Sequence, residues 1–247
     1  MKTKSIFFCS FLFLIFQYQV VKAQQELRGK ISNYSDGPSQ IESFDRFSAI
    51  SKTWGEVNEE GDFTIILEAD FLGKVREMAE EAQKNAPKGF TLSFKTASET
   101  FTCTYDEVER KDSDVMVSGL PELTLMDDRG NPTNGILYAA SSLDIARWLF
   151  TYREENASLG YYLEFYYLEG PAQAKEECKL ETYTGAGEES FEEITTIDLQ
   201  LQTGWNIIRY GIEEVFTSSN GKVLPLKLSV TRLETLPEDL MWFAVKE

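Results

Sequence analysis

The sequence predicts a mainly β protein with the architecture of an antiparallel β-sandwich, in one or two sandwich-like domains. Apolar residues alternate with polar or small residues over 63–67, 197–201 and 224–230, as half-buried strands require. Turn-forming residues such as Glu60-Gly61-Asp62 and Asn220-Gly221 separate such segments. Of the 247 residues, 42% are hydrophobic and 13% are aromatic, which is enough to form a core.

Residues 1–23 have the pattern of a secretory signal peptide. Two lysines precede an apolar run over 6–16, and Val21-Lys22-Ala23 offers a cleavage site before Gln24. The run is shorter than the roughly 20 residues that a membrane-spanning helix needs. Cys9 lies inside the run rather than after it, which argues against a lipoprotein. We therefore expect an exported protein, periplasmic or extracellular, that has no membrane span.

One amphipathic helix is predicted near 70–85. Asp70 is placed to cap its start, and Pro87 and Gly89 to end it. Its apolar stripe consists of Leu72, Val75, Met78, Ala79 and Ala82.

A charged stretch over 106–114 is the best candidate for a domain boundary, because it resembles a solvated loop. It predicts an N-terminal β-rich domain with the helix over 24–118 and a C-terminal β-sandwich domain over 119–247. A single continuous β-structure is the alternative.

Cleavage of the signal peptide would leave two cysteines, Cys103 and Cys178. An even number of cysteines in an oxidising compartment predicts one disulfide between them. The alternative is a pair of buried thiols.

The composition excludes several classes of function. The chain contains no histidine, which removes Ser-His-Asp catalysis and histidine-ligated zinc or haem. Without the three lysines of the signal peptide, 21 bases face 41 acids. Such a charge repels phosphate backbones and anionic lipids, so we expect no binding to nucleic acid or to membrane surfaces. We also expect no catalytic residues, no cofactor and no bound metal.

Two short motifs resemble functional sites but are better explained as turns. The segment Asp127-Asp128-Arg129-Gly130-Asn131 lacks the alternating acidic ligands of a calcium loop, and its arginine would repel the ion. The segment Ser219-Asn220-Gly221-Lys222 has the spacing of a serine nucleophile with a lysine base, but Asn-Gly is a hairpin signal.

An aromatic run over 161–167 supplies the candidate binding residues. On a strand, Tyr161, Leu163, Phe165 and Tyr167 would share a core face. Tyr162, Glu164 and Tyr166 would share the opposite face, where two rings flanking a carboxylate form a surface suited to a sugar. The alternative is that another element covers these tyrosines.

Several short landmarks together resemble a group of functionally uncharacterised, exported, β-rich bacterial proteins. The landmarks are Gly29-Lys30-Ile31-Ser32, Gly61-Asp62-Phe63, Thr203-Gly204-Trp205-Asn206, and Leu236-Pro237 followed by Trp242. The junction Ala23-Gln24 is similar to export signals common in Bacteroidetes. The resemblance implies an envelope or secreted location and a sandwich-like fold.

The expected function is therefore that of a non-enzymatic exported β-sandwich protein that binds a glycan or another envelope protein. A purely structural envelope component without a small ligand is a further possibility. The enzymatic alternative is a secreted glycoside hydrolase that uses paired carboxylates. Such an enzyme needs no histidine.

Overall fold

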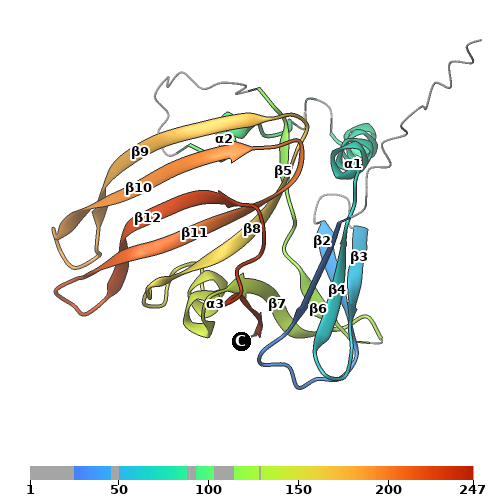
Figure 1. Cartoon of the computed structure of the whole chain (residues 1–247), viewed down its shortest axis with the longest axis horizontal. Helices are drawn as coiled ribbons and strands as arrows, with labels where there is room; N and C mark the ends of the chain where they lie inside the picture. The colour runs from blue at the N-terminus through green and yellow to red at the C-terminus, as the bar shows by residue number, and fades with distance from the viewer. Residues whose placement is uncertain are drawn as a thin grey trace, which may run out of the picture.

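The computed structural model describes residues 25–45, 50–87, 89, 93–102, 114–127 and 129–246 (Figure 1). The predicted signal peptide, Cys103 and nearly all of the charged stretch over 106–114 lie outside the described residues. The predictions made for them stay predictions.

The protein is mainly β, as predicted, and its strands form one hydrogen-bonded sheet of 13 strands. The first seven strands are β1 Gln25–Lys30, β2 Ser39–Asp45, β3 Ile50–Val57, β4 Asp62–Leu67, β5 Val117–Gly119, β6 Thr124–Met126 and β7 Pro132–Ala140. The remaining strands are β8 Gly160–Leu168, β9 Ala172–Tyr183, β10 Ser190–Leu201, β11 Gly204–Thr217, β12 Val223–Leu233 and β13 Met241–Val245.

The sheet has two parts, which lie on opposite sides of Figure 1. The long strands pair in the order β8-β11-β12-β10-β9, and the shorter ones in the order β1-β4-β3-β2-β6-β7. The β10–β12 pair is parallel, so the sheet is mixed rather than wholly antiparallel. A single Ala140–Tyr162 pairing joins β7 to β8 and thereby connects the two parts. The predicted sandwich of separate antiparallel sheets is not confirmed by this pairing.

The shorter strands close on themselves around the largest core cluster. β13 pairs with β7, and a parallel bridge between Ile31 and Trp242 connects the end of β1 to β13. The backbone N–H of Ser32 also donates to the Trp242 carbonyl at 2.8 Å. Inside this circuit lie buried apolar residues from both ends of the chain, including Leu27, Ile41, Ile65, Leu125 and Trp242.

Strands on either side of the predicted boundary at residue 118 pair with each other. β6 pairs with β2, and β5 pairs with β8. The largest core cluster likewise takes residues from both segments, for example Trp54 and Phe165. The predicted boundary therefore does not coincide with a break in the sheet or in this core.

Helix α1, Phe71–Asn85, confirms the helix predicted near 70–85. Phe71 and Leu72 are buried at its start and anchor it to the largest core cluster. Asp70 occupies the N-cap position, as predicted, but its side chain accepts no capping hydrogen bond.

Two short helices were not predicted. Helix α2, Ala97–Thr100, begins with a capping box formed by Thr96 and Glu99. Helix α3, Leu143–Phe150, begins where the Ser142 hydroxyl accepts from the Ile145 N–H at 3.3 Å. No helix in the described ranges is both long and apolar enough to cross a bilayer.

Candidate binding cavity

The aromatic run forms strand β8, and its predicted core face is confirmed. Tyr161, Leu163, Phe165 and Tyr167 are all buried in the largest core cluster, which takes residues from both parts of the sheet. The Tyr161 hydroxyl donates to the Asp239 carboxylate at 2.7 Å, and the Tyr167 hydroxyl donates to the Ala69 carbonyl at 2.7 Å. These bonds satisfy the polar ends of two buried rings, and the Arg209 guanidinium lies 4.9 Å from the centroid of the Tyr161 ring.

The opposite face of β8 is covered, so the open aromatic surface considered from the sequence does not exist. Tyr162 is only 4% exposed and packs with Ile145 and Trp148 of α3 in another core cluster. Tyr166 is half-buried, and its ring meets the edge of Phe101 at a centroid distance of 5.1 Å. The sequence pattern shows which residues share this face of β8. It does not show that helix α3 covers Tyr162.

A cavity lies where β7 and β8 separate. In the described residues, β7 pairs with β8 only at Ala140 and Tyr162, and β5 pairs with β8 only at its far end, over 166–168. Between these pairings, the Leu120 N–H donates to the Phe165 carbonyl at 2.7 Å. The space left between β7, β8 and the segment 119–123 has a volume of about 370 Å³.

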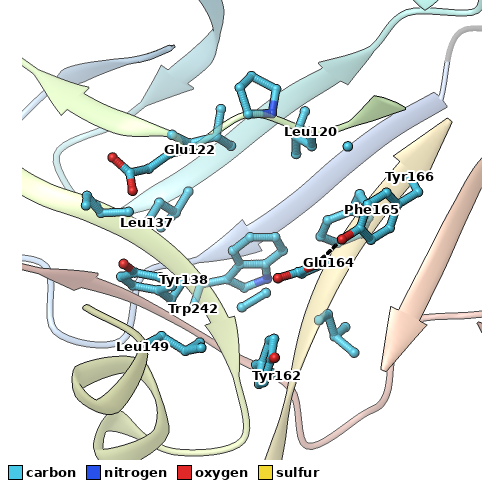
Figure 2. Close-up of a pocket in the computed structure, with 16 residues that line it drawn as sticks. Leu120, Glu122, Leu137, Tyr138, Leu149, Tyr162, Glu164, Phe165, Tyr166 and Trp242 are labelled. Carbon is cyan, nitrogen blue, oxygen red and sulfur yellow. Dashed lines mark hydrogen bonds between the residues drawn. The ribbon is translucent and has the colours of Figure 1, made fainter. Parts of the chain in front are cut away.

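Tyr162, Glu164 and Tyr166 all line this cavity, so the structure brings the three predicted site residues to one place (Figure 2). The other residues of its wall come from segment 119–123, β7, α3, β8 and β13. Figure 2 labels Leu120, Glu122, Leu137, Tyr138, Leu149, Phe165 and Trp242 among them. The wall is thus rich in aromatic rings, and its charged residues, among those that the structure describes, are Glu122 and Glu164.

The polar groups of β8 form a network with β11. The Tyr166 hydroxyl donates to the Glu164 carboxylate and lies 3.5 Å from the Tyr210 hydroxyl. Tyr210 in turn stacks on Tyr162 with a centroid distance of 5.0 Å and an interplanar angle of 7°. One carboxylate and three tyrosines are therefore fixed relative to one another, which limits the rearrangement needed when a ligand binds.

Burial and the negative charge of Glu164 keep these tyrosines protonated. Burial first, and then the charge of Glu164, raises the pKa of Tyr162 to about 12. Burial also raises the pKa values of Tyr166 and Tyr210 far above the ordinary range of a phenol, and Glu164 adds to both shifts. The hydroxyls therefore remain neutral at any physiological pH.

Glu122 and Tyr138 form a second polar pair in the wall. Burial, followed by the charge of Glu122, raises the pKa of Tyr138 above its ordinary range. Glu122 itself is exposed, whereas Tyr138 is half-buried. The described wall residues consequently supply carboxylate acceptors and neutral hydroxyls, while the Arg153 side chain, outside the wall, hydrogen-bonds the Tyr162 hydroxyl.

The end of α3 next to the cavity is strained. Tyr152 and Arg153 follow the helix with φ values of 52° and 70°, a region that side chains other than glycine rarely adopt. The Arg153 guanidinium lies 5.0 Å from the centroid of the Trp148 ring. The Arg153 N–H donates to the Trp148 carbonyl at 2.7 Å, which holds the strained turn against α3.

The two motifs interpreted as turns are turns. The Asp127 carboxylate accepts the N–H groups of Arg129 and Asn131, at 2.9 and 2.7 Å, in place of an ion. Gly221 has a φ of 84° in the connection between β11 and β12. Within the described residues, no group of three potential ligands is placed to hold a metal ion.

Comparison of the chain with known protein families, with curated proteins and with solved structures finds no match. The cavity is therefore the feature on which a proposal of function can rest.

Proposed function

We propose that the protein is an exported, non-enzymatic binding protein whose cavity between β7 and β8 holds one unit of a neutral glycan. The single observation that carries this proposal is the combination of aromatic rings with fixed oxygen acceptors in one cavity of about 370 Å³. A volume in the range of about 300 to 1,000 Å³ is typical of small-ligand sites.

The chemistry of the wall favours a hydroxyl-rich ligand without negative charge. Glu122 and Glu164 accept hydrogen bonds, and the Tyr138 and Tyr162 hydroxyls both accept and donate them. The rings of Phe165 and Trp242 offer apolar surface for the C–H face of a sugar. Among the described residues, the wall itself has two carboxylates and no base, which disfavours an anionic sugar.

Export and location are part of the same proposal. The signal-like pattern over 1–23 precedes β1, so cleavage before Gln24 would leave the whole described sheet intact. We place the protein in the periplasm or outside the cell, where glycans and envelope proteins are accessible. The two parts of the sheet contribute to one core cluster, and in that sense we regard the fold as sandwich-like.

A glycoside hydrolase is the second candidate, because two carboxylates do line one cavity. Glu122 comes from the segment before β6 and Glu164 from β8, so they are not neighbours on one strand. A hydrolase with this pair would release reducing ends from a bound glycan, whereas a binding protein would leave it intact.

A glycan array with the purified mature protein, run with and without calcium, tests the proposal. We expect binding of neutral glycans that does not depend on calcium and that weakens in the variant Glu164→Gln. The variant Glu188→Gln is the matched control, because Glu188 is exposed in the connection between β9 and β10. Absence of glycan binding would overturn the proposal. A protein that bound another envelope protein but no glycan would favour that protein as its partner.

A further inference from the structure

A second cavity, of about 260 Å³, lies between α1 and the β2–β3 hairpin. Its apolar wall includes Phe44, Trp54, Phe71 and Met78, and among the described residues its charged wall residues are Lys52 and Lys74. Among the described wall residues, the first cavity has two acids and this one has two bases, so the charged groups of the two walls differ in sign.

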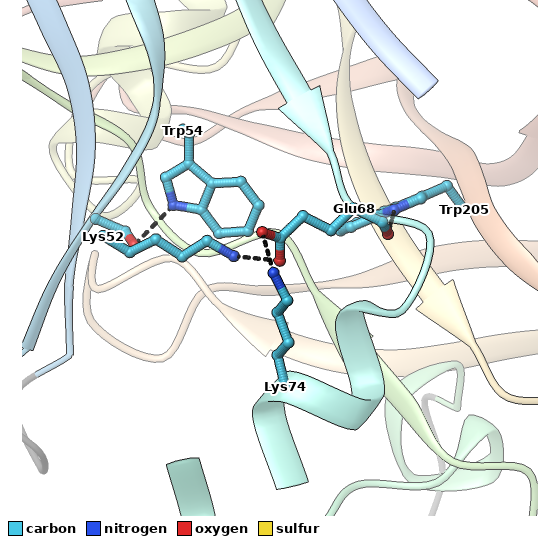
Figure 3. Close-up of polar contacts among 6 residues, drawn as sticks. Lys52, Trp54, Glu68, Lys74 and Trp205 are labelled. Carbon is cyan, nitrogen blue, oxygen red and sulfur yellow. Dashed lines mark hydrogen bonds and ion pairs between the residues drawn. The ribbon is translucent and has the colours of Figure 1, made fainter. Parts of the chain in front are cut away.

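The two lysines converge on one carboxylate (Figure 3). Glu68 accepts from the Lys52 ammonium at 2.7 Å and from the Lys74 ammonium at 2.7 Å, through different oxygens. The Lys52 ammonium also lies 3.9 Å from the centroid of the Trp54 ring. Glu77 and Asp70 also act on the Lys74 ammonium, but among the described residues the cavity wall includes the two lysines and none of these three acids.

The positions of the wall and of the carboxylate are fixed by neutral hydrogen bonds. The Trp54 indole donates to the Ser43 hydroxyl at 2.8 Å, and the Trp205 indole donates to the Glu68 carbonyl at 2.9 Å. Phe71 stacks on Trp205 with a centroid distance of 4.8 Å. The apolar wall is therefore preorganised beside the charged cluster.

The charges of Glu68 and Lys74 persist across the physiological pH range. Burial raises the pKa of Glu68, but the bonds from Lys52 and Lys74 outweigh it, so the pKa lies below its ordinary value. The bond to Glu68 raises the pKa of Lys74.

Each ammonium has donors beyond the one that it gives to Glu68. An ammonium carries three N–H donors, and Glu68 accepts one from each lysine. Glu68 also shows that a carboxylate fits between the two side chains. A second carboxylate at the cavity mouth would therefore find donors from both lysines, while an attached apolar chain would lie against Phe71 and Met78.

We propose that this second cavity binds a small amphipathic carboxylate, with its head at Lys52 and Lys74 and its apolar chain in the cavity lined by Trp54 and Phe71. The charge complementarity and the apolar wall both select this class. The site does not share the ligand proposed for the first cavity, so either proposal can fail without the other.

Isothermal titration of the mature protein with octanoate, octanol and acetate tests both halves of the ligand. We expect octanoate to bind at least about tenfold more tightly than octanol, which lacks the charge, and than acetate, which lacks the chain. Binding should also weaken as salt is added, since the lysines are partly exposed.

Two substitutions should change octanoate affinity in opposite directions. Lys74→Gln should weaken binding by about three- to tenfold, the range expected for a partly exposed ionic contact. Glu68→Gln should strengthen it, because it removes the carboxylate that competes for both ammonium groups. Lys84→Gln is the matched control, since Lys84 lies on the same helix, pairs with Glu81 and is not part of the cavity wall.

Three results would overturn the proposal. The first is no octanoate binding up to roughly 10 mM, the limit of a meaningful affinity. The second is equal affinity for octanoate and octanol, or for octanoate and acetate. The third is an octanoate affinity that Lys74→Gln changes no more than Lys84→Gln. Lys74 is more than half exposed, so its substitution leaves a folded protein in which the test can be made.

Discussion

Tyr162 of β8 and Tyr210 of β11 stack face to face beneath α3, with ring centroids 5.0 Å apart. Both rings pack in the core cluster under α3, and Tyr162 also lines the candidate cavity. Substitution at Tyr162 should therefore affect stability and the shape of the cavity together.

Truncation of Tyr162 should destabilise the protein strongly. Tyr162→Ala removes a ring that is 4% exposed, and such deletions in cores cost about 2 to 4 kcal/mol. Tyr152→Ala is the matched control because Tyr152 is 85% exposed. This substitution should change the free energy of unfolding by no more than about 0.5 kcal/mol. Urea melts measure both values. Equal, small losses would show that α3 does not cover Tyr162.

Alkaline pH should destabilise the fold through the same tyrosine. The folded pKa of Tyr162 is raised to about 12 from the value of 10.0 for a free side chain. The folded state therefore keeps a proton that the unfolded state loses, and stability present below pH 10 falls as the pH rises through 12. Each pKa unit corresponds to about 1.4 kcal/mol.

Urea melts between neutral and strongly alkaline pH measure this loss. The variant Tyr162→Phe keeps the ring and removes the ionising group, so it should lose less stability over the same range than the unsubstituted protein. An identical pH dependence in both proteins would contradict the assignment to Tyr162.

The ion pairs of Glu68 should stabilise the fold modestly and depend on salt. Glu68→Gln should cost about 1 kcal/mol at low ionic strength, because Glu68 is mostly buried and accepts from two lysines. Its lowered pKa means that this stabilisation is lost as the pH falls through that pKa. Urea melts of both proteins at low and high salt, at pH 7 and at pH 3, measure the loss of unfolding free energy caused by Glu68→Gln. The same loss in all four conditions would contradict a stabilising role of these ion pairs.

The disulfide between Cys103 and Cys178 stays a prediction with one supporting contact. Thr102, the last described residue before Cys103, donates to Glu176 at 3.4 Å, and Glu176 shares a face of β9 with the buried Cys178. Thiol titration of exported material under denaturant should find no free thiol. The double variant Cys103→Ser/Cys178→Ser should lose about 4 kcal/mol, the value for closing a long loop. Two titratable thiols would refute the bridge.

Export should produce a chain that begins at Gln24. N-terminal sequencing of protein recovered outside the cytoplasm measures this directly. A chain that retains Met1, or one that begins at a lipidated Cys9, would contradict the signal-peptide interpretation.

Patterns of local sequence predicted the elements that depend on local spacing. The apolar stripe of 70–85 predicted α1. The alternation of side chains along 161–167 predicted the core face of β8 correctly. Helix α3 was not predicted because Leu143–Phe150 is only 8 residues long, which is shorter than the stretch of about 11 to 18 residues over which a helical period is recognised.

The candidate cavity depends on contacts that no local pattern contains. Tyr162, Glu164 and Tyr166 were recognisable as one face of a strand, but Glu122, Tyr138 and Trp242 reach the same space from other elements. Their position follows from the separation of β7 and β8 and from the Ile31–Trp242 bridge, which joins distant parts of the chain. Sequence spacing does not predict such pairings.

The most direct test of the central claim is titration of the mature protein with the best neutral glycan found on the array. The variants to compare are Glu164→Gln, which alters an acceptor in the cavity, and Glu188→Gln, which makes the same change on an exposed connection. We predict about tenfold weaker binding for Glu164→Gln, the effect of weakening a hydrogen bond to a charged group, and unchanged binding for Glu188→Gln. Equal affinity in both variants would show that the glycan does not bind in this cavity.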